Sequence, residues 1–208
     1  SNPVTAYGMP EITAIEGAAV SAAQTDGGDA ITLRGVNFGP LAADGGPFID
    51  SISYGPTGTE YVLPPANYEL VSHTEISVTT IAGVGRDLSF IVTVAGQSSL
   101  PSEAKLSYAD PVITSVTPDV LSTNSPASSP TAITVTGTNF GLLDSSAFVT
   151  VMFGNPGDET LVGPLEVLSR SPRWEDNPTP ADHTPGSPHT ITFGLPASLG
   201  VDRAVGEC

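Results

Sequence analysis

Short stretches of alternating apolar and polar residues run along the whole chain, and most end at Gly, Pro or Asn. Ile76 and Val78 alternate with polar neighbours, and so do Phe90, Val92 and Val94. A period of two places one set of side chains on one face of a β-strand. No stretch keeps the 3.6-residue apolar period of an amphipathic helix. The pattern predicts an all-β chain of short strands with almost no helix.

The alternation places strands throughout the first half of the chain, each closed by turn residues. The expected strands cover residues 30–34, 49–54, 61–63, 68–72, 75–79, 89–94 and 104–108. A strand at 132–136 is expected in the second half. This spacing of strands and turns favours a β-sandwich.

One strand and its turn occur twice. Residues 30–34 run into Gly-Val-Asn-Phe-Gly at 35–39, and residues 132–136 run into Gly-Thr-Asn-Phe-Gly at 137–141. Gly and Asn tolerate the positive φ angles of tight irregular turns, and the aromatic residue between them is expected to close the end of a core. Flanking segments also match: 7–15 with 108–116, 51–55 with 150–154, and 74–78 with 189–193. We therefore predict two domains of one kind.

The order of motifs resembles the IPT/TIG family of immunoglobulin-like domains. It comprises Pro-x-Ile-Thr-x-Ile/Val at 10–15 and 111–116, the repeated Gly-x-Asn-Phe-Gly turn, and Val-Ala-Gly-Gln-Ser-Ser at 94–99. The resemblance implies two tandem immunoglobulin-like β-sandwiches, at residues 10–110 and 111–208. It implies occurrence in cell-surface receptors, bacterial and protist surface proteins, some polysaccharide-acting enzymes and a few transcription factors. The family has no catalytic residues of its own.

The charge of the chain restricts its partners. Six Lys and Arg face 22 Asp and Glu, for a formal net charge of −16. Such a chain repels phosphate backbones, so no nucleic-acid partner is expected. No run of 18 apolar residues occurs, which argues against membrane insertion. The only cysteine is Cys208, so no disulfide within a domain is possible. The resemblance implies an extracellular or cell-surface location.

The two ends of the chain suggest self-assembly. Residues 1–9 resemble the last strand of a domain, whereas the second domain, at 111–208, stops before its own last strand. We predict that residues 1–9 complete the sandwich of a neighbouring copy, which gives a head-to-tail homopolymer by β-strand addition. The alternative is one continuous tandem array in a single polypeptide. The predicted inter-subunit strand comprises Asn2, Pro3, Val4, Thr5, Ala6 and Tyr7.

Two stretches rich in Pro, Ser and Thr, around residues 122–131 and 171–188, have the composition of O-glycosylated stalks. Glycans are therefore expected as attached or bound partners, and unmodified loops are the alternative. The candidate attachment sites are Ser125, Ser129, Ser171, Thr179, Thr184 and Ser187. Trp174, in the second stretch, is a candidate platform for stacking on a sugar ring, unless it covers its own loop.

No cofactor, metal site or enzymatic activity is expected. The sequence has no His-Glu-x-x-His or Cys-His ligand spacing and no Gly-x-Ser-x-Gly nucleophile motif. The leading hypothesis is therefore a structural subunit of an extracellular filament or tandem-repeat surface array, a fibril glycoprotein. The alternative is a cell-surface adhesion or carbohydrate-binding module. A third hypothesis, an accessory domain of a glycan-processing enzyme, requires a catalytic domain elsewhere.

Overall fold

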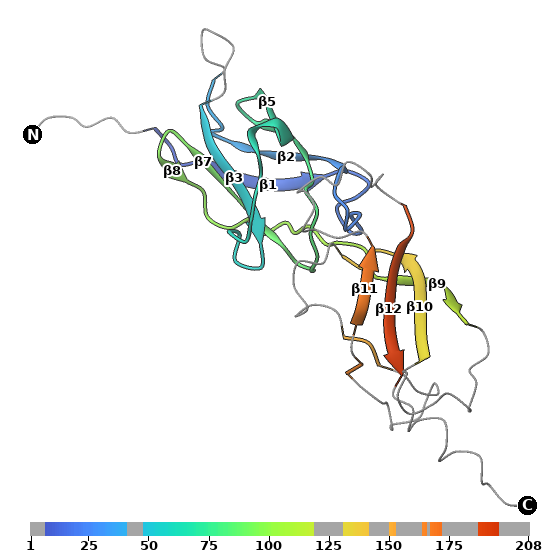
Figure 1. Ribbon diagram of the computed structural model, residues 1–208. Helices are drawn as coiled ribbons and strands as arrows, with labels where there is room; N and C mark the ends of the chain where they lie inside the picture. Colours follow the sequence, from blue (N-terminus) through green and yellow to red (C-terminus); the bar gives the residue numbers. More distant parts are fainter. Residues whose placement is uncertain are drawn as a thin grey trace, which may run out of the picture. The chain divides into compact units, whose positions relative to one another are not determined.

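The computed structural model describes residues 7–40, 48–118, 131–141, 150–152, 164–165, 167–171 and 187–195. The chain divides into two compact units, unit 1 at Ser1–Asp110 and unit 2 at Pro111–Cys208 (Figure 1). The described parts are built from antiparallel strands, with one 3-10 turn at Pro65–Asn67 and no α-helix. They also contain no helix of the length and apolar character that crossing a membrane requires. The predicted all-β, immunoglobulin-like class is confirmed.

Unit 1 is a sandwich of two four-stranded antiparallel sheets. The first sheet has the order β1 (Glu11–Glu16), β2 (Ala30–Val36), β6 (Glu75–Thr79), β5 (Tyr68–Ser72). The second has the order β4 (Tyr61–Val62), β3 (Ile49–Gly55), β7 (Ser89–Val94), β8 (Gln97–Ser98). Both sheets turn their alternate apolar residues inward, as the period of two predicts. The fully buried centre comprises Leu33, Ile52, Tyr54, Ile76, Val78, Phe90 and Val92.

The described sheet of unit 2 repeats the first sheet of unit 1. Its order is β9 (Val112–Thr117), β10 (Thr131–Thr138), β12 (His189–Leu195), β11 (Val167–Ser171). Each edge pair contains a bulge at an equivalent Thr. Thr13 Oγ1 donates to the Arg34 carbonyl at 3.2 Å, and Thr114 Oγ1 donates to the Thr136 carbonyl at 3.1 Å. The internal repeat therefore includes the side chains that hold the bulge.

The repeated turn has the same conformation in both units. Asn37 and Asn139 have φ of 63° and 58°, and the glycines that close the turns also have positive φ. Phe38 is fully buried in unit 1, and Phe140 is 7% exposed in unit 2. The prediction that this aromatic closes a core is confirmed.

The strand expected at 104–108 is not a regular element, and this expectation was wrong in part. Leu106 and Tyr108 make isolated bridges only. Upstream, Ser99 Oγ and Ser102 Oγ accept hydrogen bonds from two β7 amides, at 3.0 and 2.9 Å. Pro101, which has no N–H, lies between these serines and cannot donate to a ladder. The amides of the same two serines donate to the Val92 and Phe90 carbonyls, so each serine pairs with β7 through its main chain and its hydroxyl.

Candidate functional site

A groove of about 590 Å³ lies beside the repeated turn of unit 1. Several elements contribute to it: the turn after β2 supplies Asn37, the β5–β6 connection supplies His73, and the end of β7 supplies Val94. Phe48, just before β3, and Tyr7, ahead of β1, add aromatic rings. The turn after β2, the β5–β6 connection and the end of β7 lie at one end of the sandwich, and so residues distant in sequence line one groove.

The aromatic rings of the groove are open to solvent. Tyr7 is 91% exposed and Phe48 is 47% exposed, in a unit whose other large aromatics are mostly buried. Asn37 Nδ2 donates to the Met9 carbonyl at 2.9 Å, which holds the segment before β1 against the turn. Exposed ring faces with nearby amide and imidazole groups suit a ligand that is both apolar and hydrogen-bonding.

A second surface is the edge strand β9 of unit 2. Ile113 occupies the position that Ile12 occupies in β1, yet Ile113 is 63% exposed and Ile12 is 7% exposed. Val112 and Val116 of the same strand are also exposed. Among the described strands, β9 has a partner on one side only, and such an edge with exposed apolar side chains is a template for strand addition.

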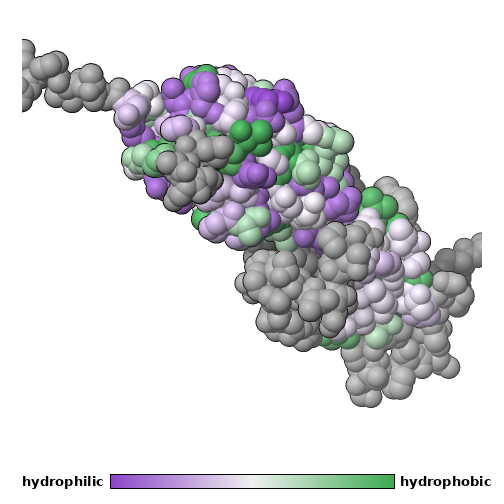
Figure 2. All heavy atoms as spheres, turned by 90° about the horizontal axis from the view of Figure 1, so that it is seen from above, coloured by the Kyte–Doolittle hydropathy of each residue, from purple (hydrophilic) through white to green (hydrophobic). Residues whose placement is uncertain are grey.

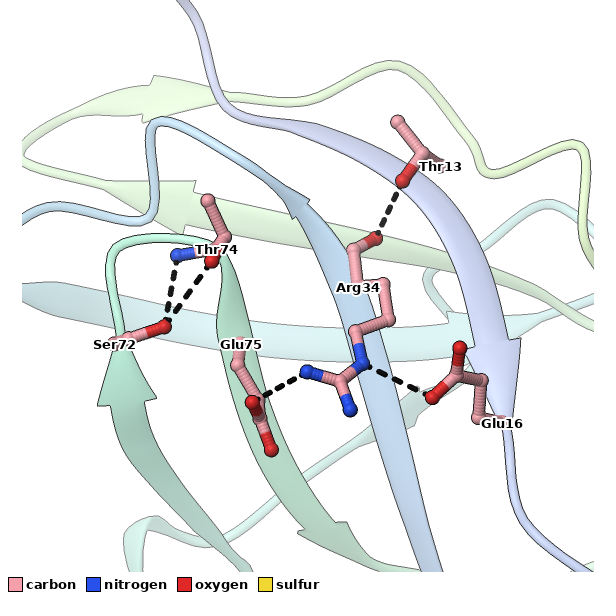
Figure 3. Close-up of polar contacts among 6 residues, drawn as sticks. All are labelled: Thr13, Glu16, Arg34, Ser72, Thr74 and Glu75. Atoms are coloured by element: carbon pink, nitrogen blue, oxygen red, sulfur yellow. Dashed lines mark hydrogen bonds and ion pairs between the residues drawn. The ribbon is translucent and has the colours of Figure 1, made fainter.

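Charged side chains gather on the outer face of the first sheet of unit 1. Arg34 in β2 lies between Glu16 of β1 and Glu75 of β6 and pairs with both (Figure 3). The hydrogen bond to Glu16 is the main cause that raises the pKa of the Arg34 guanidinium, and the charges of both glutamates act in the same direction. Exposed pairs of this kind contribute little to stability. This trio is a solvated sheet face and does not form a pocket.

The described residues contain no group of three His, Cys, Asp or Glu placed to hold a metal ion. His73 and His189 occupy related places: the Phe38 amide donates to the His73 carbonyl at 3.0 Å, and the Phe140 amide donates to His189 Nδ1 at 3.3 Å. Both histidines therefore support the repeated turn.

Most of the sites predicted from sequence lie outside the described residues. Of the inter-subunit strand, only Tyr7 is described. Ser187 precedes β12 and is half-buried, and Ser171, expected in a loop, is the last residue of β11, where its main chain pairs with Thr190. The remaining predicted sites lie outside the described ranges: Asn2, Pro3, Val4, Thr5, Ala6, Ser125, Ser129, Thr179, Thr184, Trp174 and Cys208.

Comparison with known families identifies the repeated motif. Residues 111–160 match the family model of the IPT/TIG domain. This part of unit 2 is therefore similar to an IPT/TIG domain. The match includes β9, the Thr114 bulge and the Gly-Thr-Asn-Phe-Gly turn. Among curated proteins, no relative matches the chain.

Several solved structures resemble this chain weakly. One, a crystal structure with xylogluco-oligosaccharide, is 21% identical over 94% of this chain and 36% of its own, with a TM-score of 0.36. SGBP-B from a xyloglucan utilization locus in Bacteroides uniformis is 18% identical over 91% and 43%, with a TM-score of 0.35. The plexin A4 extracellular region is 16% identical over 96% and 13%, with a TM-score of 0.36. The chain spans less than half the length of each.

Proposed function

We propose that this chain is a non-catalytic binding module displayed at a cell surface, and that the groove of unit 1 takes a neutral sugar ring. The observation that carries the proposal is the pair of exposed rings, Tyr7 and Phe48, in one groove with Asn37, His73 and Gln97. Aromatic faces stack on the apolar face of a ring, while amide and imidazole groups hydrogen-bond to hydroxyls. The net charge of −16 disfavours anionic ligands.

The chemistry of the groove agrees with binding rather than catalysis. Its described lining contains no carboxylate and no thiol, and His73 is its only imidazole. A catalytic site needs a nucleophile, a base and an orienting group that converge on one reacting atom. The described groove offers polar groups that orient a ligand.

We expect Tyr7→Ala and Phe48→Ala each to weaken binding of a neutral oligosaccharide by roughly tenfold, the effect of losing one stacking ring. A glycan array identifies the oligosaccharide, and isothermal titration calorimetry measures the change. Val62→Ala is the matched control, because Val62 is an exposed apolar residue of β4 that does not line the groove. Equal affinity of all three variants, or no binding of any neutral glycan by the unaltered chain, contradicts the proposal.

A second candidate function is head-to-tail self-association into an extracellular filament or array. It is favoured by the contrast between buried Ile12 and exposed Ile113 at equivalent positions. A strand from another copy that pairs with β9, on the side where no described strand lies, would cover Ile113 and bond to the main chain of β9. We propose residues 1–9 of the neighbouring copy as this strand, at the β9 edge and not in the place of the last strand of the second domain that the sequence predicted. Such a contact is heterologous and therefore builds an open chain of subunits.

Ile113→Lys is expected to reduce assemblies of the chain to monomers, because a charge on β9 opposes strand addition. Sedimentation velocity and electron micrographs of negatively stained protein measure the change. Val71→Lys is the control, since Val71 is an exposed apolar residue on β5, the edge strand of a sheet in unit 1. Monomers at every concentration of the unaltered chain, or filaments that persist in Ile113→Lys, would argue against strand addition at β9.

A further inference from the structure

The outer face of the described unit 2 sheet carries two rows of hydroxyl residues, one across three strands and one across all four. The register of β9, β10, β12 and β11 places these residues side by side. The first row is Ser115, Thr136 and Thr190. The second row is Thr117, Thr134, Thr192 and Ser169. Together they are the hydroxyl rows.

The hydroxyl rows face away from the core. The alternate residues Ile133, Ile191 and Phe193 are buried, so the residues between them point outward. Thr134 Oγ1 and Thr192 Oγ1 are hydrogen-bonded at 2.9 Å across two strands. Strand spacing makes the rows about 10 Å and about 14 Å long, and the two rows lie about 7 Å apart.

The corresponding face of unit 1 is charged. Its first row is Ala14, Arg34, Glu75 and Ser72, and its second row is Glu16, Thr32, Ser77 and Glu69. The matching positions in unit 2 hold no charged residue, although the chain as a whole carries −16. In the view of Figure 2, the described surface of unit 1 shows patches of deep purple, while that of unit 2 is mostly pale. The hydroxyl rows therefore suit an uncharged partner.

We propose that the hydroxyl rows bind a neutral polysaccharide chain laid across the strands. Each Ser or Thr hydroxyl can donate and accept, as sugar hydroxyls can. The hydroxyl rows include no aromatic, Arg or large aliphatic residue, the types on which protein partners depend. Single hydroxyl contacts are weak because they compete with water. A polymer that repeats along a row makes many of them at once, which raises the overall affinity.

The twist of the sheet favours a flexible chain over a flat crystalline surface. Adjacent strands rotate by about 20–25° relative to one another, so the ends of a four-residue row do not lie in one plane. A polysaccharide chain in solution can follow this twist, whereas a rigid lattice such as ice cannot. The inference is independent of the groove, because the groove belongs to unit 1.

The test is affinity electrophoresis of the full chain through gels that contain hydroxyethyl cellulose or dextran, with polygalacturonate as the anionic comparison. The unaltered chain is expected to be retarded by a neutral polymer and not by the anionic one. Thr136→Val with Thr190→Val removes two hydroxyls and keeps side-chain shape and strand propensity. We expect this pair to weaken retardation roughly tenfold. Thr32→Val with Ser77→Ala, at the matching face of unit 1, should leave it unchanged.

Circular dichroism tests whether the variants fold. If Thr136→Val with Thr190→Val does not fold, Ser115→Ala with Thr117→Ala on the exposed strand β9 takes its place. The inference is overturned if neither neutral polymer retards the unaltered chain, or if the folded row variants are retarded as strongly as that chain. It is also overturned if the chain shapes growing ice crystals without binding a polymer. If Tyr7→Ala abolishes retardation and the row variants do not, binding belongs to the groove and only the proposed function stands.

Discussion

Gly35→Ala is expected to lower the free energy of unfolding of unit 1 by about 3–4 kcal/mol, because the new methyl group has no space. A Cβ at Gly35 would lie 2.0 Å from the Glu11 carbonyl oxygen and 2.4 Å from Phe38 Cζ. Neither neighbour can move cheaply: Glu11 is paired with β2 in the sheet, and Phe38 is fully buried. Urea unfolding followed by circular dichroism measures the change.

The same chain offers matched controls for this substitution. A Cβ at Gly137 would meet the Val112 carbonyl oxygen at 2.0 Å and Phe140 Cζ at 2.4 Å, so Gly137→Ala should destabilise unit 2 comparably. A Cβ at Gly96 would meet nothing within 4 Å. The cost of Gly96→Ala therefore comes from its φ of +77° alone and is about 1–2 kcal/mol. If Gly35→Ala is no more destabilising than Gly96→Ala, the turn can relax around the methyl group.

Unit 1 is expected to lose about 4 kcal/mol of stability between pH 10 and pH 12, because of a buried tyrosine pair. Tyr54 Oη and Tyr108 Oη are hydrogen-bonded at 2.6 Å, and Tyr108 Oη donates to the Ile81 carbonyl at 2.6 Å. Burial raises the pKa of Tyr54 from 10.0 to about 12, and burial also raises the pKa of Tyr108. Above pH 10 the unfolded chain ionises while the folded chain stays neutral, so rising pH favours unfolding.

Tyrosinate absorbance recorded against pH, together with circular dichroism, measures this alkaline transition. The absorbance change of the two buried hydroxyls should coincide with the loss of the circular dichroism signal, since these hydroxyls ionise when unit 1 unfolds. Tyr54→Phe with Tyr108→Phe should remove this pH dependence, at the cost of the hydrogen bonds to Ile81. Tyr7→Phe, which alters an exposed ring, should leave the transition in place. Ionisation of all tyrosines with no loss of folded signal would contradict the argument.

Much of the fold follows from local sequence. The period of two in Ile31, Leu33, Ile76 and Val78 predicted which face of each strand is buried. The Gly-x-Asn-Phe-Gly turn predicted a positive φ at Asn37 and a buried aromatic after it. These features depend on the steric preferences of a few neighbouring residues, and so a short window of sequence contains them.

The groove and the hydroxyl rows were not predicted from sequence. Phe48 and His73 carry no motif, and they meet because three connections end at the same edge of unit 1. The alternation Thr134-x-Thr136 and Thr190-x-Thr192 is visible in the sequence. Its significance depends on the register of β10 with β12, which brings residues far apart along the chain side by side.

By itself the sequence determined that the chain is all-β, that it contains one strand-and-turn motif twice, and that its net charge is strongly negative. These properties depend on residue type and local conformational preference. Only the tertiary structure decided which of two similar residues is covered. Ile12 and Ile113 stand in matching Pro-x-Ile-Thr segments, yet one is buried and the other exposed. Burial depends on which distant segments pack over a strand, and the strand's own residues do not specify them.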